Sequence, residues 1–431
     1  MAGFWPAGFL RRTKHSRRFS GSIEPRHNSK LLLSISWVPY ECTLYAYVMG
    51  NSSSSSSSAP KHSCQVVIVG GGYAGVKLAI DLDSYCKVVL IDPKDAFHHN
   101  MAGLRCIVEP AFVNKTLIPY EGVLKHGSFV KNRVVSCNIS RKAVTLASSE
   151  EISYDYLVFA CGSSVPFPGK VPLGTSMKDA EKLYRDCADQ VAKSNKIVVI
   201  GGGPVGVELV GELASDFPDK KVTLMHNREQ ILDDRLSRKF VKKIQDGMKA
   251  LKVETVLGER VDMDDLNFDS DKPWITGPVT LTTDQGTSVP ADLVFRCTGL
   301  KVNSVAYQSK LSDKMEKNGS LKVDRFLQVE EIENVFAIGD CNNTPELKLA
   351  YTAKLHADAV AENIKRLNES KRPKEYKPGN AAMALPLGRN GGATQLPNGM
   401  VAGSFLTKSF KGKDIMTPSF WKLMKQKMPS N

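Results

Sequence analysis

The sequence predicts an α/β protein with two Rossmann-type dinucleotide-binding domains and a C-terminal segment. A strand, a glycine-rich turn, a helix and a second strand follow one another after Cys64, and the same pattern returns after Asn195, about 130 residues later. The length of 431 residues suits two or three hydrophobic cores better than one. The composition, 42% hydrophobic and 24% charged, is ordinary for a globular protein.

Short apolar runs mark the expected strands. Gln65–Val69 and Lys87–Ile91 flank the first glycine-rich turn and its helix, and Lys196–Ile200 and Lys221–Met225 flank the second. Continuous apolar runs are typical of strands buried on both faces of a parallel sheet. Three further short strands are expected at Tyr156–Ala160, Leu293–Arg296 and Val335–Ile338.

The first turn has the spacing G-x-G-x-x-G, which binds the pyrophosphate of a dinucleotide. Gly70 permits the tight turn, Gly72 lets the phosphates approach the backbone, and Gly75 lets the helix pack closely on the strand. A carboxylate at the end of the next strand accepts hydrogen bonds from ribose hydroxyls. The predicted contacts of this site are Gly70, Gly71, Gly72, Tyr73, Ala74, Gly75 and Asp92.

The second turn repeats this spacing with Gly201, Gly203 and Gly206. The strand that follows ends in His226, then Asn and Arg, without an acid. Because no carboxylate repels a 2′-phosphate, the site is expected to accept NADPH as well as NADH, with His226 among its contacts. A solvated loop after this strand is the alternative interpretation.

Two dinucleotide sites in one chain favour internal redox chemistry. One site would hold FAD tightly, and the other would take exchangeable NADH or NADPH as the hydride donor. The nine cysteines form no C-x-x-C pair, so the sequence indicates neither a metal site nor a redox-active dithiol. This spacing disfavours a disulfide reductase and suggests free thiols in a reducing compartment.

The net charge of +13 resides at the two ends of the chain. Residues 1–48 carry +5 and residues 371–431 carry +9, which leaves −1 for the middle. Basic ends indicate an anionic partner, either a membrane or nucleic acid, unless they serve solubility alone. Aromatic and lysine side chains alternate in the C-terminal segment, a pattern that suits a membrane interface or packing on the first domain: Phe405, Lys408, Phe410, Lys411, Lys413, Phe420, Trp421 and Lys422.

The N-terminal region suggests two locations. Residues 1–48 are rich in Arg and Ser and poor in acids, which is typical of a transit peptide and of a mitochondrial location. Met49-Gly50 opens a match to the N-myristoylation pattern, and a serine run follows as a flexible linker. If translation starts at Met49, Gly50 is lipidated and the protein is expected in the cytoplasm and at membranes, such as the plasma membrane or the lipid-droplet surface.

Several motifs occur in an order that resembles the apoptosis-inducing-factor-like family, in particular its NAD(P)H:quinone oxidoreductases. They are VVIVGGGYAG, IDPKDAFHHN, VPFPGK, KIVVIGGGPVGVELVGEL, CTGLKVN, VFAIGDC and GRNGG. The resemblance covers roughly residues 49–425. It implies a reductase with FAD, NAD(P)H and a ubiquinone-type acceptor in a membrane, whose lipids it would protect from peroxidation.

The resemblance also implies roles for single residues. Those that would contact FAD or lie near the flavin are Asp340, Arg105, Val134 through its backbone, and Lys170. Glu208 would lie beside the nicotinamide, and Tyr351 would face the quinone. Relatives carry Thr where this chain has Cys161, and His98 and His99 are candidates for proton transfer by position alone.

The expected domains follow from these motifs. They are an extension and linker (1–61), the first part of the FAD domain (62–170), the NAD(P) domain (171–291), the second part of the FAD domain (292–375) and a C-terminal segment that covers the flavin side (376–431). The alternative function is a cell-death or DNA-binding module with a structural flavin. The two glycine-rich turns and Glu208 favour the enzyme.

Overall fold

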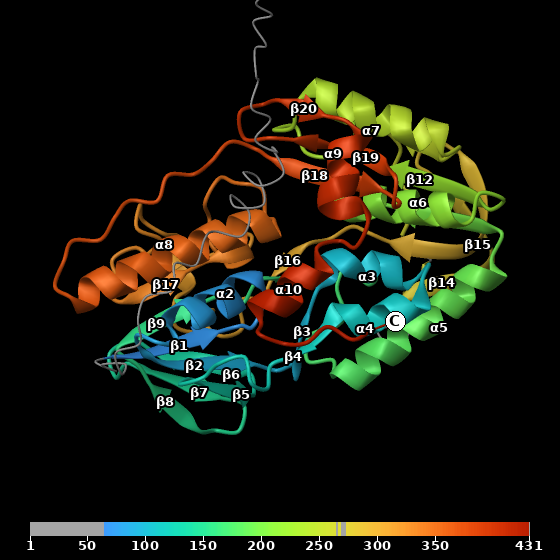
Figure 1. Ribbon diagram of the computed structural model, residues 1–431. Helices are drawn as coiled ribbons and strands as arrows, with labels where there is room; N and C mark the ends of the chain where they lie inside the picture. The colour runs from blue at the N-terminus through green and yellow to red at the C-terminus, as the bar shows by residue number, and fades with distance from the viewer. Residues whose placement is uncertain (1–63, 264–265, 269–272, 431) are drawn as a thin grey trace, which may run out of the picture. The chain divides into compact units, whose positions relative to one another are not determined.

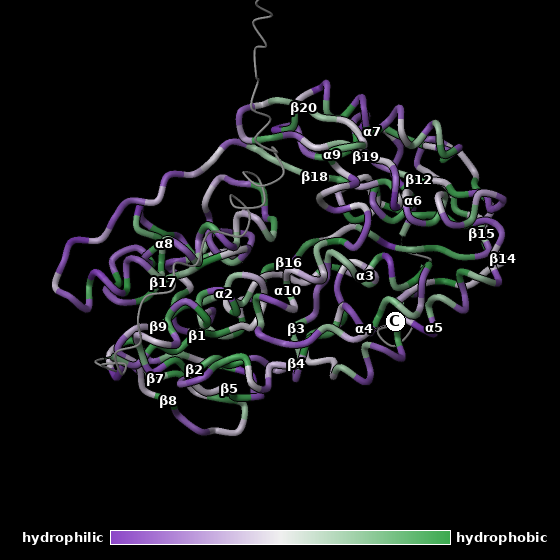
Figure 2. The backbone as a smooth tube through the Cα atoms, in the orientation of Figure 1, coloured by the Kyte–Doolittle hydropathy of each residue, from purple (hydrophilic) through white to green (hydrophobic). Residues whose placement is uncertain are grey.

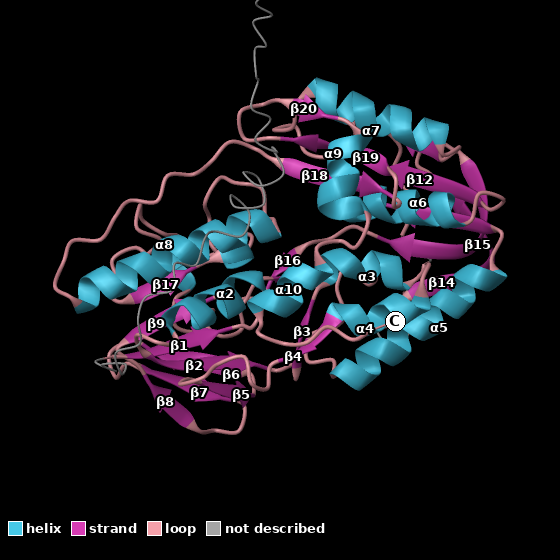
Figure 3. Cartoon of the chain, viewed as in Figure 1, coloured by secondary structure: helices cyan, strands magenta, loops and turns pink. Residues whose placement is uncertain are grey.

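The computed structural model describes residues 64–430, apart from 264–265 and 269–272. The expectations for residues 1–48, for lipidation of Gly50 and for the serine linker lie outside the described residues. Two five-stranded sheets dominate the described part, which confirms the α/β class (Figures 1 and 3). None of the described helices is long and apolar enough to cross a bilayer.

The first sheet is parallel throughout and has the strand order β17–β9–β1–β2–β5. Its strands are β1 (Gln65–Val69), β2 (Lys87–Asp92), β5 (Ser128–Lys131), β9 (Tyr156–Phe159) and β17 (Val335–Ala337). Every residue of β9 and β17 is buried, as expected where both faces of a sheet are covered. Because β17 follows the second sheet in sequence, two separate chain segments build this domain.

Helix α2 (Tyr73–Leu82) starts directly after the first glycine-rich turn. It packs beside α8 (Ala350–Asn368), as Figure 1 shows, and buries Leu78, Ala79 and Leu82. The domain's other elements are β3 (Ala96–His98), β4 (Leu117–Pro119), the antiparallel strands β6 (Val134–Asn138), β7 (Ala143–Leu146) and β8 (Glu151–Ser153), and the short helices η2 (Ser312–Lys314) and η3 (Gly339–Cys341).

The second sheet has the order β13–β12–β11–β15–β14, with β14 antiparallel at its edge. Its strands are β11 (Lys196–Ile200), β12 (Lys221–His226), β13 (Glu254–Leu257), β14 (Trp274–Thr282) and β15 (Ser288–Arg296). Its helices are α5 (Met177–Lys193), α6 (Pro204–Asp216) and α7 (Arg238–Ala250). The expected boundary at 291 falls inside β15, whose residues Leu293–Arg296 pair with β11, so the second domain extends to Arg296.

The two domains share a hydrophobic core as well as two chain crossings. The crossings pair as the short strands β10 (Ser163–Ser164) and β16 (Lys301–Val302). Helices α3 (Asn100–Cys106), η1 (Pro110–Phe112) and α4 (Val113–Thr116) belong to the first domain by sequence. Their apolar side chains nevertheless pack in one cluster with those of α5 and α6. This shared core fixes the relative placement of the two glycine-rich turns.

The C-terminal segment contacts both domains. Strands β18 (Met383–Leu387) and β19 (Gly391–Gln395) pack on α6 and α7. The remaining elements are β20 (Val401–Ala402), α9 (Ser404–Thr407), a π-helical turn η4 (Lys408–Gly412) and α10 (Thr417–Leu423), and α10 packs on the first domain through its aromatic side chains. The segment therefore bridges the two domains instead of covering the flavin side alone.

Its aromatic residues do not form one surface. Trp421 is buried and its indole N–H donates to the Lys115 carbonyl at 2.9 Å. Phe420 packs against Phe97 and His99, so both aromatic residues of α10 are packing residues. Phe405 is 83% exposed, and the side chain of Phe410 lies outside the described part.

Candidate functional site

The two glycine-rich turns have the same geometry. Gly70 and Gly201 adopt φ angles of +111° and +122°, which glycine tolerates and other residues avoid. A Cβ on Gly75 would lie 1.8 Å from the Gly70 oxygen, and a Cβ on Gly206 would lie 1.9 Å from the Gly201 oxygen. Both helices therefore start close to their strands because these positions lack side chains.

Gly72 and Gly203 keep open space at the starts of α2 and α6. A Cβ on either residue would meet no heavy atom within 4 Å. No side chain caps either helix, so the amide groups of the first turns are available to a ligand. Helix starts of this kind bind phosphate, and the space suits the pyrophosphates of two dinucleotides.

Asp92 lies at the first turn, where the sequence predicted it. The carboxylate is buried and accepts the Gly71 amide N–H at 2.6 Å and the Lys94 ammonium at 2.6 Å. The Tyr120 hydroxyl donates to the Gly71 carbonyl at 2.6 Å. Oδ1 also accepts the Lys94 amide N–H at 2.9 Å, whereas Oδ2 accepts only the Gly71 amide among the described residues and keeps a lone pair for a ribose hydroxyl.

His226 packs against the second turn. A Cβ on Gly202 would lie 2.6 Å from its ring, and Arg228 Nε lies 3.5 Å from its Nε2. Burial and the Arg228 charge lower the pKa of His226, so its ring is neutral at pH 7. An arginine, not an acid, is the charged neighbour here, and acceptance of NADPH stays a prediction.

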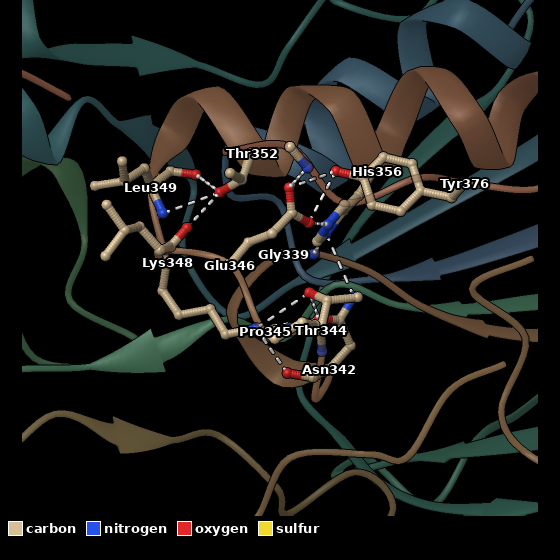
Figure 4. A network of polar contacts seen from close by, with 12 residues as sticks. Gly339, Asn342, Thr344, Pro345, Glu346, Lys348, Leu349, Thr352, His356 and Tyr376 are labelled. Carbon is tan, nitrogen blue, oxygen red and sulfur yellow. Dashed lines mark hydrogen bonds and ion pairs between the residues drawn. The ribbon is translucent and has the colours of Figure 1, made fainter. Parts of the chain in front are cut away.

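Asp340 lies in η3, directly after β17, and a buried network fixes this turn. The Gly339 amide donates to His356 Nδ1 at 3.1 Å, so the neutral ring carries its proton on Nε2, which donates to Glu346 at 3.1 Å. Tyr376 donates to Glu346 at 2.9 Å, and Figure 4 shows these groups together. This network fixes the η3 turn and therefore the position of Asp340.

The structure brings Lys170 to Asp340. The Ser163 hydroxyl donates to Asp340 Oδ2 at 2.6 Å, and Lys170 Nζ lies 3.4 Å from the same oxygen. Lys170 also donates to the Ser163 carbonyl at 2.7 Å. A carboxylate with a hydroxyl donor and a cation at its side is suited to hold polyol hydroxyls, which is the role predicted for Asp340.

Glu208 is the fifth residue of α6 and pairs with a residue of the C-terminal segment. Lys411 Nζ lies 2.6 Å from Glu208 Oε1, and only 10% and 12% of the two side chains are exposed. Lys411 also donates to the Ala384 carbonyl at 3.5 Å. Burial raises the pKa of Glu208, and the charge of Lys411 opposes that rise.

Tyr73, in the first turn, is influenced by charged residues of both dinucleotide sites. Its hydroxyl accepts the Met101 amide N–H at 3.1 Å and lies 3.0 Å from His99 Nδ1. Loss of solvent contact and the negative charges of Glu208 and Asp340 raise the pKa of Tyr73. Glu208 on α6 and Asp340 on η3 therefore lie within electrostatic range of one side chain, so the two sites approach each other there.

His98 and His99 are both buried, and burial lowers their pKa values to about 3 and about 4. His99 Nε2 lies 2.7 Å from the Ile415 carbonyl, to which it donates. Its Nδ1 then accepts from the Tyr73 hydroxyl. The structure gives His99 a role in attaching the C-terminal segment, where the sequence suggested proton transfer.

Arg105 forms a buried ion pair between two helices. Its side chain is fully buried, with Nε 2.5 Å from Glu212 Oε2 and a terminal nitrogen 2.9 Å from Glu212 Oε1. That terminal nitrogen also donates to the Gly412 carbonyl at 3.1 Å. The guanidinium joins α3, α6 and the C-terminal segment, and the contact of Arg105 with FAD stays a prediction.

Val134 and Tyr351 lie on elements of the first domain. Val134 begins β6, opposite Leu146, and is buried in the core beneath the first sheet. Tyr351 is the second residue of α8, at the end of that helix that packs on η3. Tyr351 therefore lies near the turn that carries Asp340, and its contact with a quinone stays a prediction.

Cys161 lies against the first turn, where its Cα is 3.1 Å from the position of a Cβ on Gly70. A hydrogen bond with Cys341 and burial raise the pKa of Cys161 well above its usual value. The same hydrogen bond lowers the pKa of Cys341, which is buried. A second thiol pair, Cys64 and Cys86, lies 3.0 Å apart at the amino ends of β1 and β2, away from the turn.

The residues of the first site fit FAD. Both ring nitrogens of His98 and Oδ1 of Asn100 are buried without a hydrogen-bond partner among the described residues. Buried polar atoms are nearly always paired, and His98 lies within electrostatic range of Asp92. A polar cofactor bound at the first turn would offer hydrogen-bond partners to these unpaired groups. Asp92 and Asp340 would contact its two hydroxyl-bearing parts.

Two phosphate-binding turns, each between parallel strands, with the carboxylates Glu208 and Asp340 of the two domains both within electrostatic range of Tyr73, define an FAD- and NAD(P)H-dependent oxidoreductase. The chain belongs to the pyridine nucleotide-disulphide oxidoreductase family, whose model matches residues 64–357. Its cofactors are FAD and NAD(P)H.

Relatives specify the resemblance further. The chain is 39% identical to ferroptosis suppressor protein 1 of Taeniopygia guttata over 373 residues, which is 85% of this chain and 98% of that protein. It is 35% identical to apoptosis-inducing factor homolog B of Dictyostelium discoideum, over 81% of this chain and 94% of that protein. These matches confirm the resemblance to the apoptosis-inducing-factor-like family.

A solved structure shows the same fold. The sulfide:quinone oxidoreductase of Aquifex aeolicus superposes with a TM-score of 0.65 over 85% of this chain and 93% of that chain, at 18% identity.

Several residues of the site were not expected from the sequence. They are Lys94, Glu212, Glu346, His356 and Lys411 in its pairing role. Only Glu212 carried a local signal, because it lies one helical turn after Glu208, and two adjacent acids on a buried helix require cations nearby.

We predict that Lys411→Met moves the pH dependence of flavin reduction by NADH. Without the cation, Glu208 is buried alone, its pKa rises, and its charged form requires a higher pH. The acidic limb of the rate profile should therefore shift to higher pH, whereas Lys411→Arg should restore it. Stopped-flow flavin bleaching measures the profile. Lys422→Met, at an exposed position of the same segment, is the control, and an equal shift there would contradict the pairing.

We predict that Arg105→Met destabilises the protein by roughly 3–5 kcal/mol, because it leaves Glu212 buried and unpaired. The double variant Arg105→Met/Glu212→Leu should recover most of this loss. Chemical denaturation of the FAD-loaded protein measures both. If the single variant keeps its stability but loses FAD, the contact with FAD is correct and the interdomain role is not.

Proposed function

We propose that the protein is an NAD(P)H:quinone oxidoreductase that reduces a ubiquinone-type quinone at a membrane and thereby protects lipids from peroxidation. Bound FAD accepts a hydride from NAD(P)H and passes the electrons on, one or two at a time. Glu208 would orient the nicotinamide, Lys170 and Asp340 would hold the flavin side, and Tyr351 would line the quinone site.

The observation that carries the proposal is that two complete dinucleotide turns are held together in one chain by a shared core. The buried pair of Arg105 and Glu212 joins α3 of the first domain to α6, the helix that starts at the second turn. The fold would therefore hold cofactors bound at the two turns near each other. Such proximity is what direct hydride transfer requires.

The quinone acceptor is supported by two arguments. The motifs resemble those of NAD(P)H:quinone oxidoreductases, and relatives with 39% identity are named ferroptosis suppressor protein 1. The absence of a C-x-x-C pair from the sequence disfavours the main rival among electron acceptors, a substrate disulfide. Steady-state oxidation of NADH with a soluble ubiquinone analogue, compared with a disulfide substrate, tests this acceptor.

A second candidate function is a DNA-binding or cell-death module with a structural flavin. The observation in its favour is the charge of +9 over residues 371–431. Against it, Glu208 is paired with a dedicated buried lysine, which a structural flavin does not need. DNA affinity with steep salt dependence, in a protein that does not oxidise NADH, would favour this candidate.

The location follows from the start of translation. If Met49 is the first residue, a myristoyl group on Gly50 would attach the protein to membranes from the cytoplasm, with the basic C-terminal segment as a second signal. The N-terminal mass of the protein from its native cell tests this. A mass that begins with acylated Gly50 supports it, and a start within or after a cleaved 1–48 segment in mitochondria contradicts it.

We predict that Glu208→Gln slows flavin reduction by NADH about 10- to 100-fold, because a hydrogen bond to a charged group contributes roughly 1.5–3 kcal/mol. FAD content should stay unchanged, since Glu208 lies on α6, outside the first turn. Stopped-flow absorbance and the FAD-to-protein ratio measure the two effects. A wild-type reduction rate would leave Glu208 as a structural residue.

A further inference from the structure

Phe405 is the most exposed large hydrophobic side chain among the described residues, at 83%. It lies in α9, two residues after Gly403, the N-cap of that helix. Met400, 53% exposed, precedes β20 on the other side of the same short connection. The two residues therefore flank β20, the edge strand of the C-terminal sheet.

This edge of the sheet is held rigidly. The Thr407 hydroxyl of α9 lies 2.8 Å from the Thr394 hydroxyl of β19, and both threonines are buried. Thr407 also donates to the Gly403 carbonyl at 3.2 Å. Because α9 is fastened to β19, the exposure of Phe405 is a fixed feature of the fold and the apolar side chain faces water at a cost.

Helix α7 lies beside α9, since both pack on β19 (Figure 1). Its buried side is apolar, and Figure 2 shows hydrophilic residues along its outer turns. The exposed cations of that outer side are Arg238, Lys239, Lys242, Lys243 and Lys249, against one exposed acid, Asp246, which pairs with Lys242 at 3.0 Å. Lys243 Nζ lies 3.9 Å from the position of a Cβ on Gly403, so the basic side adjoins the apolar tip.

We propose that Phe405, Met400 and the outer side of α7 form a docking surface for an anionic lipid bilayer. Apolar side chains gain by entering the acyl boundary, while neighbouring cations are attracted to anionic headgroups. Duplex nucleic acid would contact the cations through its phosphates and would leave the apolar tip of Phe405 and Met400 in water. The inference deepens the proposed function, on which it rests for the membrane, by naming the contacting residues and the lipid charge.

The surface would complement the myristoyl group. One myristoyl chain gives only marginal, reversible binding, so a second signal is required for stable attachment. The same C-terminal segment supplies Lys411 to Glu208 on its inner side. Docking through its outer side would therefore hold the catalytic body against the bilayer that contains the quinone.

The test uses the full chain, purified without acylation and loaded with FAD, in co-sedimentation with phosphatidylcholine vesicles with and without phosphatidylserine. We expect binding to the vesicles with phosphatidylserine, weaker at higher salt. Phe405→Ser should weaken it about tenfold, and the double variant Lys239→Glu/Lys243→Glu should weaken it by about 30-fold or more, since it removes two cations and adds two acids. Val305→Ser, which changes an exposed apolar residue after β16, is the matched control and should bind like the unchanged protein.

The outcomes separate this proposal from the proposed function. Unchanged flavin reduction by NADH in all three variants, with weaker vesicle binding in the first two, supports it. The docking surface is overturned if Phe405→Ser binds vesicles as well as the unchanged protein does. It is also overturned if the lysine variant loses binding to duplex DNA but keeps its binding to vesicles. A protein that binds vesicles but does not oxidise NADH would contradict the proposed enzymatic function and still support the docking surface.

Discussion

The buried ion pair between Arg105 and Glu212 joins the two dinucleotide domains, and the geometry of the site depends on it. Neither side chain is more than 3% exposed, so each charge would be costly without the other. Arg105 lies on α3 and Glu212 on α6, the helix that starts at the phosphate-binding Gly203. Fixing α6 against α3 therefore places the second cofactor site relative to the first.

Helix α6 carries two acids one turn apart, and neither is neutralised from within the helix. Like charges at this spacing destabilise a helix. Glu212 receives Arg105 from the first domain, and Glu208 receives Lys411 from the C-terminal segment. Both acids of this helix therefore have a cationic partner only when the two domains and the C-terminal segment are packed together, so the environment of Glu208 depends on the integrity of the fold.

The C-terminal segment has two sides with different chemistry. Its inner side supplies Lys411, accepts hydrogen bonds from Arg105 and His99, and packs α10 on the first domain. Its outer side presents Phe405 beside a basic helix. A segment that completes the site on one side and meets the surroundings on the other is well placed to bring the reaction to a membrane, in keeping with the proposals above.

The sequence by itself determined the two turns, their four flanking strands and the α/β class. These features rest on local constraints, namely positive φ at Gly70 and Gly201, helix starts without side chains, and apolar runs that match parallel strands. It also placed Asp92 and Asp340 at strand ends, where the structure has them. The boundary after residue 291 was wrong because β15 takes its place from pairing with β11, which the local pattern does not contain.

Only the tertiary structure decided which charges meet. Arg105 finds Glu212 across 107 residues, and Lys411 finds Glu208 across 203. It likewise buried Trp421 and left Phe405 in solvent, although both occur in the same aromatic and basic segment. The physical reason is that Coulomb attraction and the cost of desolvation depend on distance and burial, and the packing of distant segments sets both.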